Sequence, residues 1–160
     1  MSIFEKVHIQ GFRRLYDVDL KLNSLNVVIG ANGCGKTSLL DVFSLLAASA
    51  VGRLKETISD LGGIDSNLTN LLAVNGEKAK FMAFKLVMTV PGYNPIEYRI
   101  TTSPQGVRYE IANETLAQQQ DKMSQPFKHI EVHYGDIRYY GPEGMMKGQV
   151  RPNWEYNHTE

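Results

Sequence analysis

The stretch Gly30-Ala31-Asn32-Gly33-Cys34-Gly35-Lys36-Thr37 matches the phosphate-binding loop pattern G-x-x-x-x-G-K-[ST] at every fixed position. The apolar residues of the run 25–29 predict a short buried strand before the loop. After the loop, residues 38–51 carry apolar side chains at helical spacing. A strand, a glycine-rich turn and a helix together aim backbone N–H groups and a helix N-terminus at a phosphate. The stretch therefore predicts a nucleotide-binding site at the start of a helix.

The residue types in the loop have chemical reasons. Glycines allow backbone angles that other residues resist, so the chain can wrap closely around an anion. We expect Lys36, the one residue predicted to be catalytic, to place its ammonium on the β- and γ-phosphates of ATP, and the Thr37 hydroxyl to ligate Mg²⁺. The predicted ATP-binding residues are those of the loop and the first helical turn: Gly30, Ala31, Asn32, Gly33, Cys34, Gly35, Lys36, Thr37 and Ser38.

Cys34 is the only cysteine of the chain, which excludes an internal disulfide and suits a reducing cytoplasm. It occupies a position that the loop pattern leaves free. We interpret it as a small residue that fits there. The alternative is a redox-sensitive thiol whose pKa is lowered by the neighbouring N–H dipoles.

Composition sets limits on the protein class. At 160 residues the chain is long enough for one domain with a core. Its 17 basic and 17 acidic side chains cancel, so net charge neither favours nor opposes a nucleic-acid partner. No stretch approaches the ~20 apolar residues of a membrane span, and the first ten residues lack the apolar core of a signal peptide. We therefore expect a cytoplasmic protein without membrane contact.

The remaining pattern predicts an α/β fold in which a P-loop unit (about residues 1–60) adjoins an antiparallel β subdomain (about residues 77–140). Alternation predicts an antiparallel pair of strands at 4–12 and 15–22, leading into the strand before the loop. Helical pieces are expected within 52–76. A three-strand meander is expected at 79–90, 96–102 and 107–111, followed by a polar helix or connection at 114–124 and strands within 126–140.

Residues 9–43, IQGFRRLYDVDLKLNSLNVVIGANGCGKTSLLDVF, resemble the N-terminal lobe of ABC-type ATPases of the RecF/SMC-like class. The resemblance includes the Phe12-Arg13-Arg14 opening, the strand Asp17-Val18-Asp19-Leu20, Asn32 in the loop and Asp41 after a Leu-Leu pair. It implies that Arg13 or Arg14 lies near the base and α-phosphate of ATP; otherwise the pair is a solvated strand end. It also implies a glutamine that senses Mg²⁺, with Gln125 and Gln149 as candidates.

Other features of this class are missing from the sequence. No run of four apolar residues precedes Asp-Glu, as a Walker B segment requires, and no Ser-Gly-Gly signature precedes a helix. The resemblance therefore implies a first lobe only, completed by a second lobe or subunit in a homo- or heterodimer. It implies work in DNA metabolism or anti-phage defence, with direct DNA binding left open. Alone, the chain is expected to bind nucleotide weakly and hydrolyse it near background, since phosphoryl transfer needs every group in place.

Alternative interpretations remain. The chain could be a nucleotide-sensing module without hydrolysis, or a P-loop kinase or GTPase, although it has no Asn-Lys-x-Asp guanine motif. Residues His129, Glu131 and His133 alternate on one strand face and could form a facial metal site. An aromatic and basic set could stack on bases of a single strand, or simply pack: Tyr134, Arg138, Tyr139 and Tyr140.

Overall fold

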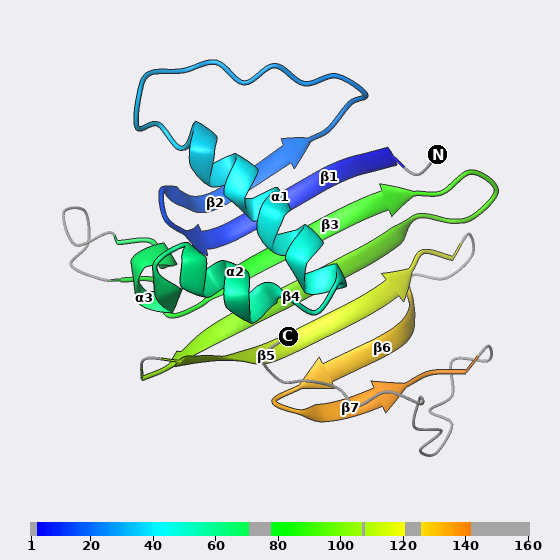
Figure 1. Cartoon of the computed structure of the whole chain (residues 1–160). Coiled ribbons are helices and arrows are strands. Elements are labelled where there is room, and N and C mark those ends of the chain that lie inside the picture. The colour runs from blue at the N-terminus through cyan, green and yellow to red at the C-terminus, as the bar shows by residue number, and fades with distance from the viewer. Residues whose placement is uncertain (1–2, 71–77, 107, 121–125, 142–160) are drawn as a thin grey trace.

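The computed structural model describes residues 3–70, 78–106, 108–120 and 126–141. Within them, seven strands form one antiparallel sheet in the order β2-β1-β3-β4-β5-β6-β7 (Figure 1). The strands are β1 (Ile3–Phe12), β2 (Leu15–Lys21), β3 (Met82–Thr89), β4 (Ile96–Gln105), β5 (Arg108–Gln118), β6 (Phe127–His133) and β7 (Asp136–Tyr139). The strands expected before the loop at 4–12 and 15–22 and those expected for the β subdomain therefore lie in one antiparallel sheet.

Three helices cover one face of this sheet: α1 (Lys36–Ala50), α2 (Leu54–Asp60) and α3 (Gly63–Asn67) (Figure 1). Among the described helices, none is long and apolar enough to cross a membrane. The core lies between the helices and the sheet, where Val42 and Leu45 of α1 belong to one apolar cluster with Val7, Ile9 and Phe84. The hydrophobic effect thus holds α1 on strands β1 and β3.

Alternation along the strands separates the two faces of the sheet. In β1, Val7 and Ile9 are fully buried beneath the helices, whereas His8 and Gln10 are only partly buried on the opposite face. The register pairs Ile9 with Phe84 of β3 and His8 with Lys85 of β3. The sheet is therefore apolar on the face that the helices cover and polar on the opposite face. The polar face carries no helix in Figure 1.

A polar contact also ties the end of α1 to the sheet. The Tyr98 hydroxyl of β4 lies 2.9 Å from the Ser49 hydroxyl of α1 and donates to the Glu114 carboxylate of β5 at 2.7 Å. Burial, together with the nearby Glu114 charge, raises the pKa of Tyr98 above its usual value. Tyr98 therefore stays a neutral donor throughout the physiological range.

Most elements expected from the sequence are confirmed. The first two strands pair in antiparallel fashion, the helix after the loop forms, and the meander runs through β3, β4 and β5. The region 52–76 contains α2 and α3, although residues 71–77 lie outside the described part. The strands expected within 126–140 are β6 and β7.

Two expectations are wrong. Residues 25–29 form no strand, and the side chains of Leu25, Val27, Val28 and Ile29 are 79%, 77%, 52% and 88% exposed. A buried strand needs hydrogen-bonding neighbours, and the described sheet ends at β2 without pairing this segment. The second correction concerns residues 114–118, expected to be helical or irregular. They complete β5 because β4 and β6 pair with them on both sides.

We predict that Gly11→Ala destabilises the protein by about 3 kcal/mol. Gly11 has a φ of 70°, and a Cβ there would overlap the carbonyl oxygen of Phe81. Gly52→Ala is the matched control, because its φ of 67° imposes similar backbone strain while nothing lies within 4 Å of the added carbon. The control should lose only about 1 kcal/mol in urea denaturation. Equal losses in the two variants would contradict the close contact between Gly11 and Phe81.

Candidate nucleotide-binding site

The candidate site is the turn that enters α1. Gly33 and Gly35 have φ angles of 79° and 106°, which place both in the left-handed region that favours glycine. Helix α1 begins at Lys36, has no side-chain cap at its N-terminus and carries no acidic residue in its first turn. Its first N–H groups therefore have no intrahelical partner, and the helix dipole adds positive potential there. The turn has the properties of an anion-binding site.

The Lys36 side chain folds back over this turn. Its ammonium donates to the carbonyl oxygens of Gly30 and Ala31, each at 2.7 Å, and lies 3.9 Å from the Cys34 sulfur. All these contacts are exposed, so an incoming anion can replace the two carbonyl partners at low cost. Thr37 is exposed and Ser38 is buried. The lysine, the hydroxyl and the uncapped turn thus fit a Mg²⁺-bound polyphosphate.

Gly30 and Cys34 come together across the turn. The Cys34 N–H donates to the Ala31 carbonyl at 3.3 Å, and a Cβ built on Gly30 would lie 2.7 Å from the Cys34 sulfur. A side chain at position 30 would therefore require the Cys34 side chain to move, whereas Gly33 and Gly35 are favoured by their φ angles. Cys34 itself is exposed, and its redox role stays a prediction.

The β1–β2 turn lies against the loop and separates the two arginines. A Cβ on Gly33 would sit 3.9 Å from the guanidinium carbon of Arg14, and one on Gly35 would sit 3.2 Å from the Leu15 side chain. Arg14 is exposed and makes no hydrogen bond or ion pair with the described residues. It is therefore the arginine of the pair whose charge is available beside the loop.

Arg13 points into the structure instead. It has a φ of 47°, and its backbone N–H donates to the Asn67 carbonyl at 2.7 Å. Its Nε donates to the Asn67 side-chain oxygen at 2.8 Å, and its Nη1 pairs with the Asp41 carboxylate of α1. The guanidinium carbon also lies 5.2 Å from the centre of the Phe12 ring. Arg13 thus links the hairpin to α1 and α3.

Asn67 was not identified from the sequence. It is 1% exposed, and its amide nitrogen donates to the carbonyls of Leu61 and Gly63 at 3.1 and 2.6 Å. Its environment is built by a helix end and a hairpin far away in the chain. The sequence around it shows only a segment rich in Asn and Ser, so no local pattern distinguishes it.

The other candidate residues do not join this site. Gln125 and Gln149 lie outside the described residues. The alternative metal set gains no support. His133 Nδ1 contacts Asn113 at 2.6 Å, Glu131 accepts from Lys128 and Tyr140, and the described residues contain no group of three or more His, Cys, Asp or Glu that could hold a metal. The alternative stacking set is divided, because Arg138 pairs with Asp136 and Tyr140 donates to Glu131, while Tyr134 is 59% exposed.

Residues 1–132 match the family described as AAA ATPase domain. The match covers more than half of the chain, and the chain belongs to this family. A stretch of 44 residues is also 50% identical to the uncharacterized protein YbjD of Escherichia coli (strain K12). That stretch is 28% of this chain and only 8% of the E. coli protein. Family membership implies ATP as the nucleotide, usually with Mg²⁺.

We predict that Arg13→Ala lowers the free energy of unfolding by about 2 kcal/mol, since it leaves the Asp41 carboxylate and the Asn67 amide oxygen without their charged partner. Arg14→Ala, the neighbouring control, should change it by less than about 0.5 kcal/mol. Combining Arg13→Ala with Asp41→Ala should cost less than the sum of the single changes, because they remove the same ion pair. Additive losses in chemical denaturation would show that the two side chains do not interact.

Proposed function

We propose that this chain is the ATP-binding lobe of a RecF/SMC-like ATPase and that a second lobe or subunit completes its hydrolytic site. The observation that carries the proposal is the uncapped N-terminus of α1 behind a glycine turn, with the Lys36 ammonium held over the same turn. The first 132 residues belong to an ATPase family, which supports ATP as the ligand. The finer assignment to the RecF/SMC-like class rests on the sequence resemblance of residues 9–43.

The chemistry of binding follows from the residues around the turn. The N–H groups of α1 and the Lys36 ammonium neutralise the phosphates, and Thr37 offers its exposed hydroxyl to Mg²⁺. We assign the arginine role to Arg14, because its guanidinium is beside Gly33 whereas that of Arg13 is held by Asp41 and Asn67. Bound Mg²⁺ would supply charge neutralisation at the transferred phosphate.

The exposed run before the loop supports completion by a second lobe or subunit. Large apolar side chains at residues 25–29 stand in solvent directly before the phosphate-binding turn. Such a patch commonly marks an interaction site. We propose that strands of the second lobe pair with this run and bring the catalytic base and the signature loop to ATP. The completed enzyme would couple ATP hydrolysis to DNA metabolism or anti-phage defence.

A nucleotide-sensing module is the second candidate. The sequence supplies the lysine, the threonine and the backbone cradle but no recognisable Walker B carboxylates. In this alternative, ATP occupancy itself changes the surface that a partner recognises, and turnover is not required.

We predict that Lys36→Ala weakens ATP binding at least about tenfold in calorimetry, the loss expected for one hydrogen-bonded charge on a phosphate. Lys55→Ala is the matched control, because Lys55 of α2 is exposed and makes no ion pair within the described part. Arg14→Ala should weaken ATP binding by a smaller factor without loss of stability. Unchanged ATP affinity in Lys36→Ala would overturn the proposed site.

We also predict that the purified chain hydrolyses ATP at close to the background rate, because the groups that polarise the attacking water are absent from it. The measurement is steady-state phosphate release, with Lys36→Ala as the blank. Release by the unaltered chain well above this blank would show that a complete hydrolytic site exists here. It would exclude the sensing module and completion by a different chain, and leave only a second copy of this chain as the completing subunit.

A further inference from the structure

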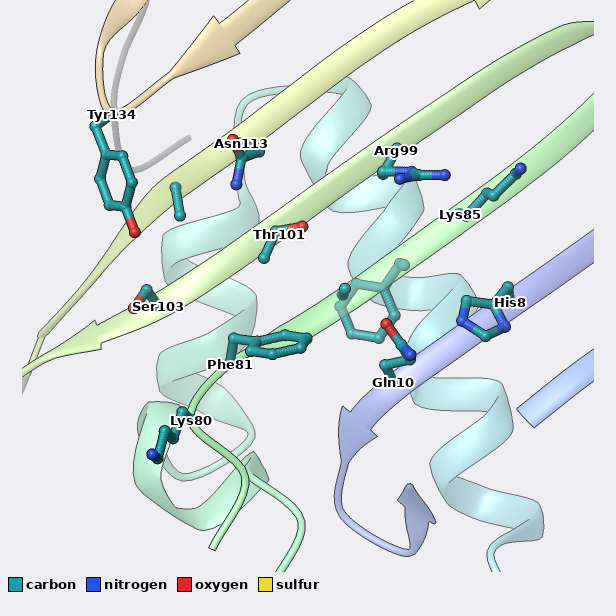
Figure 2. Close-up of a pocket in the computed structure, with 13 residues that line it drawn as sticks. His8, Gln10, Lys80, Phe81, Lys85, Arg99, Thr101, Ser103, Asn113 and Tyr134 are labelled. Carbon is teal, nitrogen blue, oxygen red and sulfur yellow. The ribbon is translucent and has the colours of Figure 1, made fainter. Parts of the chain in front are cut away.

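The sheet face opposite the helices carries a hollow of about 490 Å³ (Figure 2). Its floor comes from β1, β3, β4 and β5, and the β6–β7 turn forms one side. The volume lies within the range of clefts that bind small organic ligands. No part of the phosphate-binding loop lines it, so this hollow is separate from the ATP site.

The lining is positively charged although the whole chain is neutral. Lys80, Lys85 and Arg99 line the hollow, and no carboxylate does. Outside the lining, Glu97 lies 2.7 Å from Lys85 and 3.5 Å from Arg99, and Asp17 and Asp19 lie 3.5 and 3.2 Å from the lining residue His8. Lys80 is exposed and makes no ion pair with the described residues. The hollow therefore keeps a net positive charge that an anionic ligand can neutralise.

Two aromatic rings stand on either side of β4 in this hollow, Phe81 on one side and Tyr134 on the other (Figure 2). They are 43% and 59% exposed, unlike the buried Phe12 and Phe84. Tyr134 has a φ of 43°, unusual for a bulky residue, and its N–H donates to the Ala112 carbonyl at 2.9 Å. Phe81 is placed by the close contact of its carbonyl with Gly11. Both rings are thus held at the surface by their backbones.

We propose that this hollow binds a short segment of single-stranded nucleic acid. The cations Lys80, Lys85 and Arg99 neutralise phosphates, and the exposed rings stack on bases, the combination by which single strands are held without sequence preference. Thr101, Ser103 and Asn113 also line the hollow (Figure 2), and their hydroxyl groups and the Asn113 amide nitrogen offer hydrogen bonds. An acidic peptide would use the cations but would gain little from two separated aromatic faces. This site gives the proposed coupling to DNA a contact surface and rests on that part of the proposed function.

The test is fluorescence anisotropy of a labelled oligothymidylate of about ten nucleotides with the full chain, without ATP, at several salt concentrations. Phe81→Ala and Tyr134→Ala should each weaken binding at least about fivefold, while Tyr134→Phe should retain it. Arg99→Gln should weaken binding and reduce the slope of log affinity against log salt by about 0.7, the value for one lost phosphate contact.

Matched controls lie away from the hollow. Tyr93→Ala alters a 70% exposed tyrosine beyond β3, and Arg53→Gln alters an exposed arginine paired with Glu56 on the helix side. Both should leave oligonucleotide binding unchanged. Circular dichroism of each variant confirms folding before its affinity is interpreted.

Any one of the following outcomes would overturn the proposal: no binding at low salt, equal loss in hollow and control variants, full displacement by thymidine monophosphate at equal nucleotide concentration, or displacement by polyglutamate together with unchanged binding in Phe81→Ala. Lys36→Ala should bind the oligonucleotide normally, and Arg99→Gln should bind ATP normally. These two variants distinguish failure of the oligonucleotide-site proposal from failure of the ATP-site proposal. Loss of oligonucleotide binding in Lys36→Ala would place the oligonucleotide in the ATP loop and contradict its binding in the hollow.

Discussion

The arrangement of the proposed ATP site depends on Arg13, whose side chain joins three elements that are distant in the sequence. It bonds to Asn67 at the end of α3 and pairs with Asp41 of α1. Asp41 follows Thr37 by four residues, about one helical turn, so the pair fixes the first turn of α1 against the β1–β2 hairpin. Apolar packing of α1 on the sheet stabilises the helix there but does not fix its orientation, because the hydrophobic effect is non-directional. The charged contact between Arg13 and Asp41 fixes that orientation.

The features that could be predicted from the sequence are those that a local pattern of residues determines. Alternation identified β1, β2 and the meander, and the octet 30–37 identified the turn with its left-handed glycines. It could not separate Arg13 from Arg14, since the two are adjacent and chemically identical. Only the contact with Asn67, 54 residues away, decides which of them is turned inward. The polar segment 114–118 likewise became a strand through its neighbours, a non-local effect that outweighs local propensity.

The exposed run at 25–29 shows the same limit in the opposite direction. Its composition predicts a buried strand, but a strand also requires partners for its N–H and C=O groups. In the described sheet β2 is the edge strand, and this run does not pair with it. The apolar composition of residues 25–29 therefore suits a buried strand, whereas in the described structure these residues are exposed and unpaired with the sheet. This mismatch between apolar composition and exposure is the physical argument for a completing lobe or subunit beside the proposed ATP loop.

The two proposed sites share strand β1, which decides how they can influence each other. Strand β1 turns Val7 and Ile9 toward α1, and His8 and Gln10 toward the hollow. Its end carries the arginine turn beside the ATP loop, while Gly11, two residues before Arg13, touches the carbonyl of Phe81. A displacement of this turn by ATP would reach Phe81 through backbone contact alone. Thermodynamic linkage then requires that a bound oligonucleotide stacked on Phe81 changes the affinity for ATP by the same factor as ATP changes the affinity for the oligonucleotide.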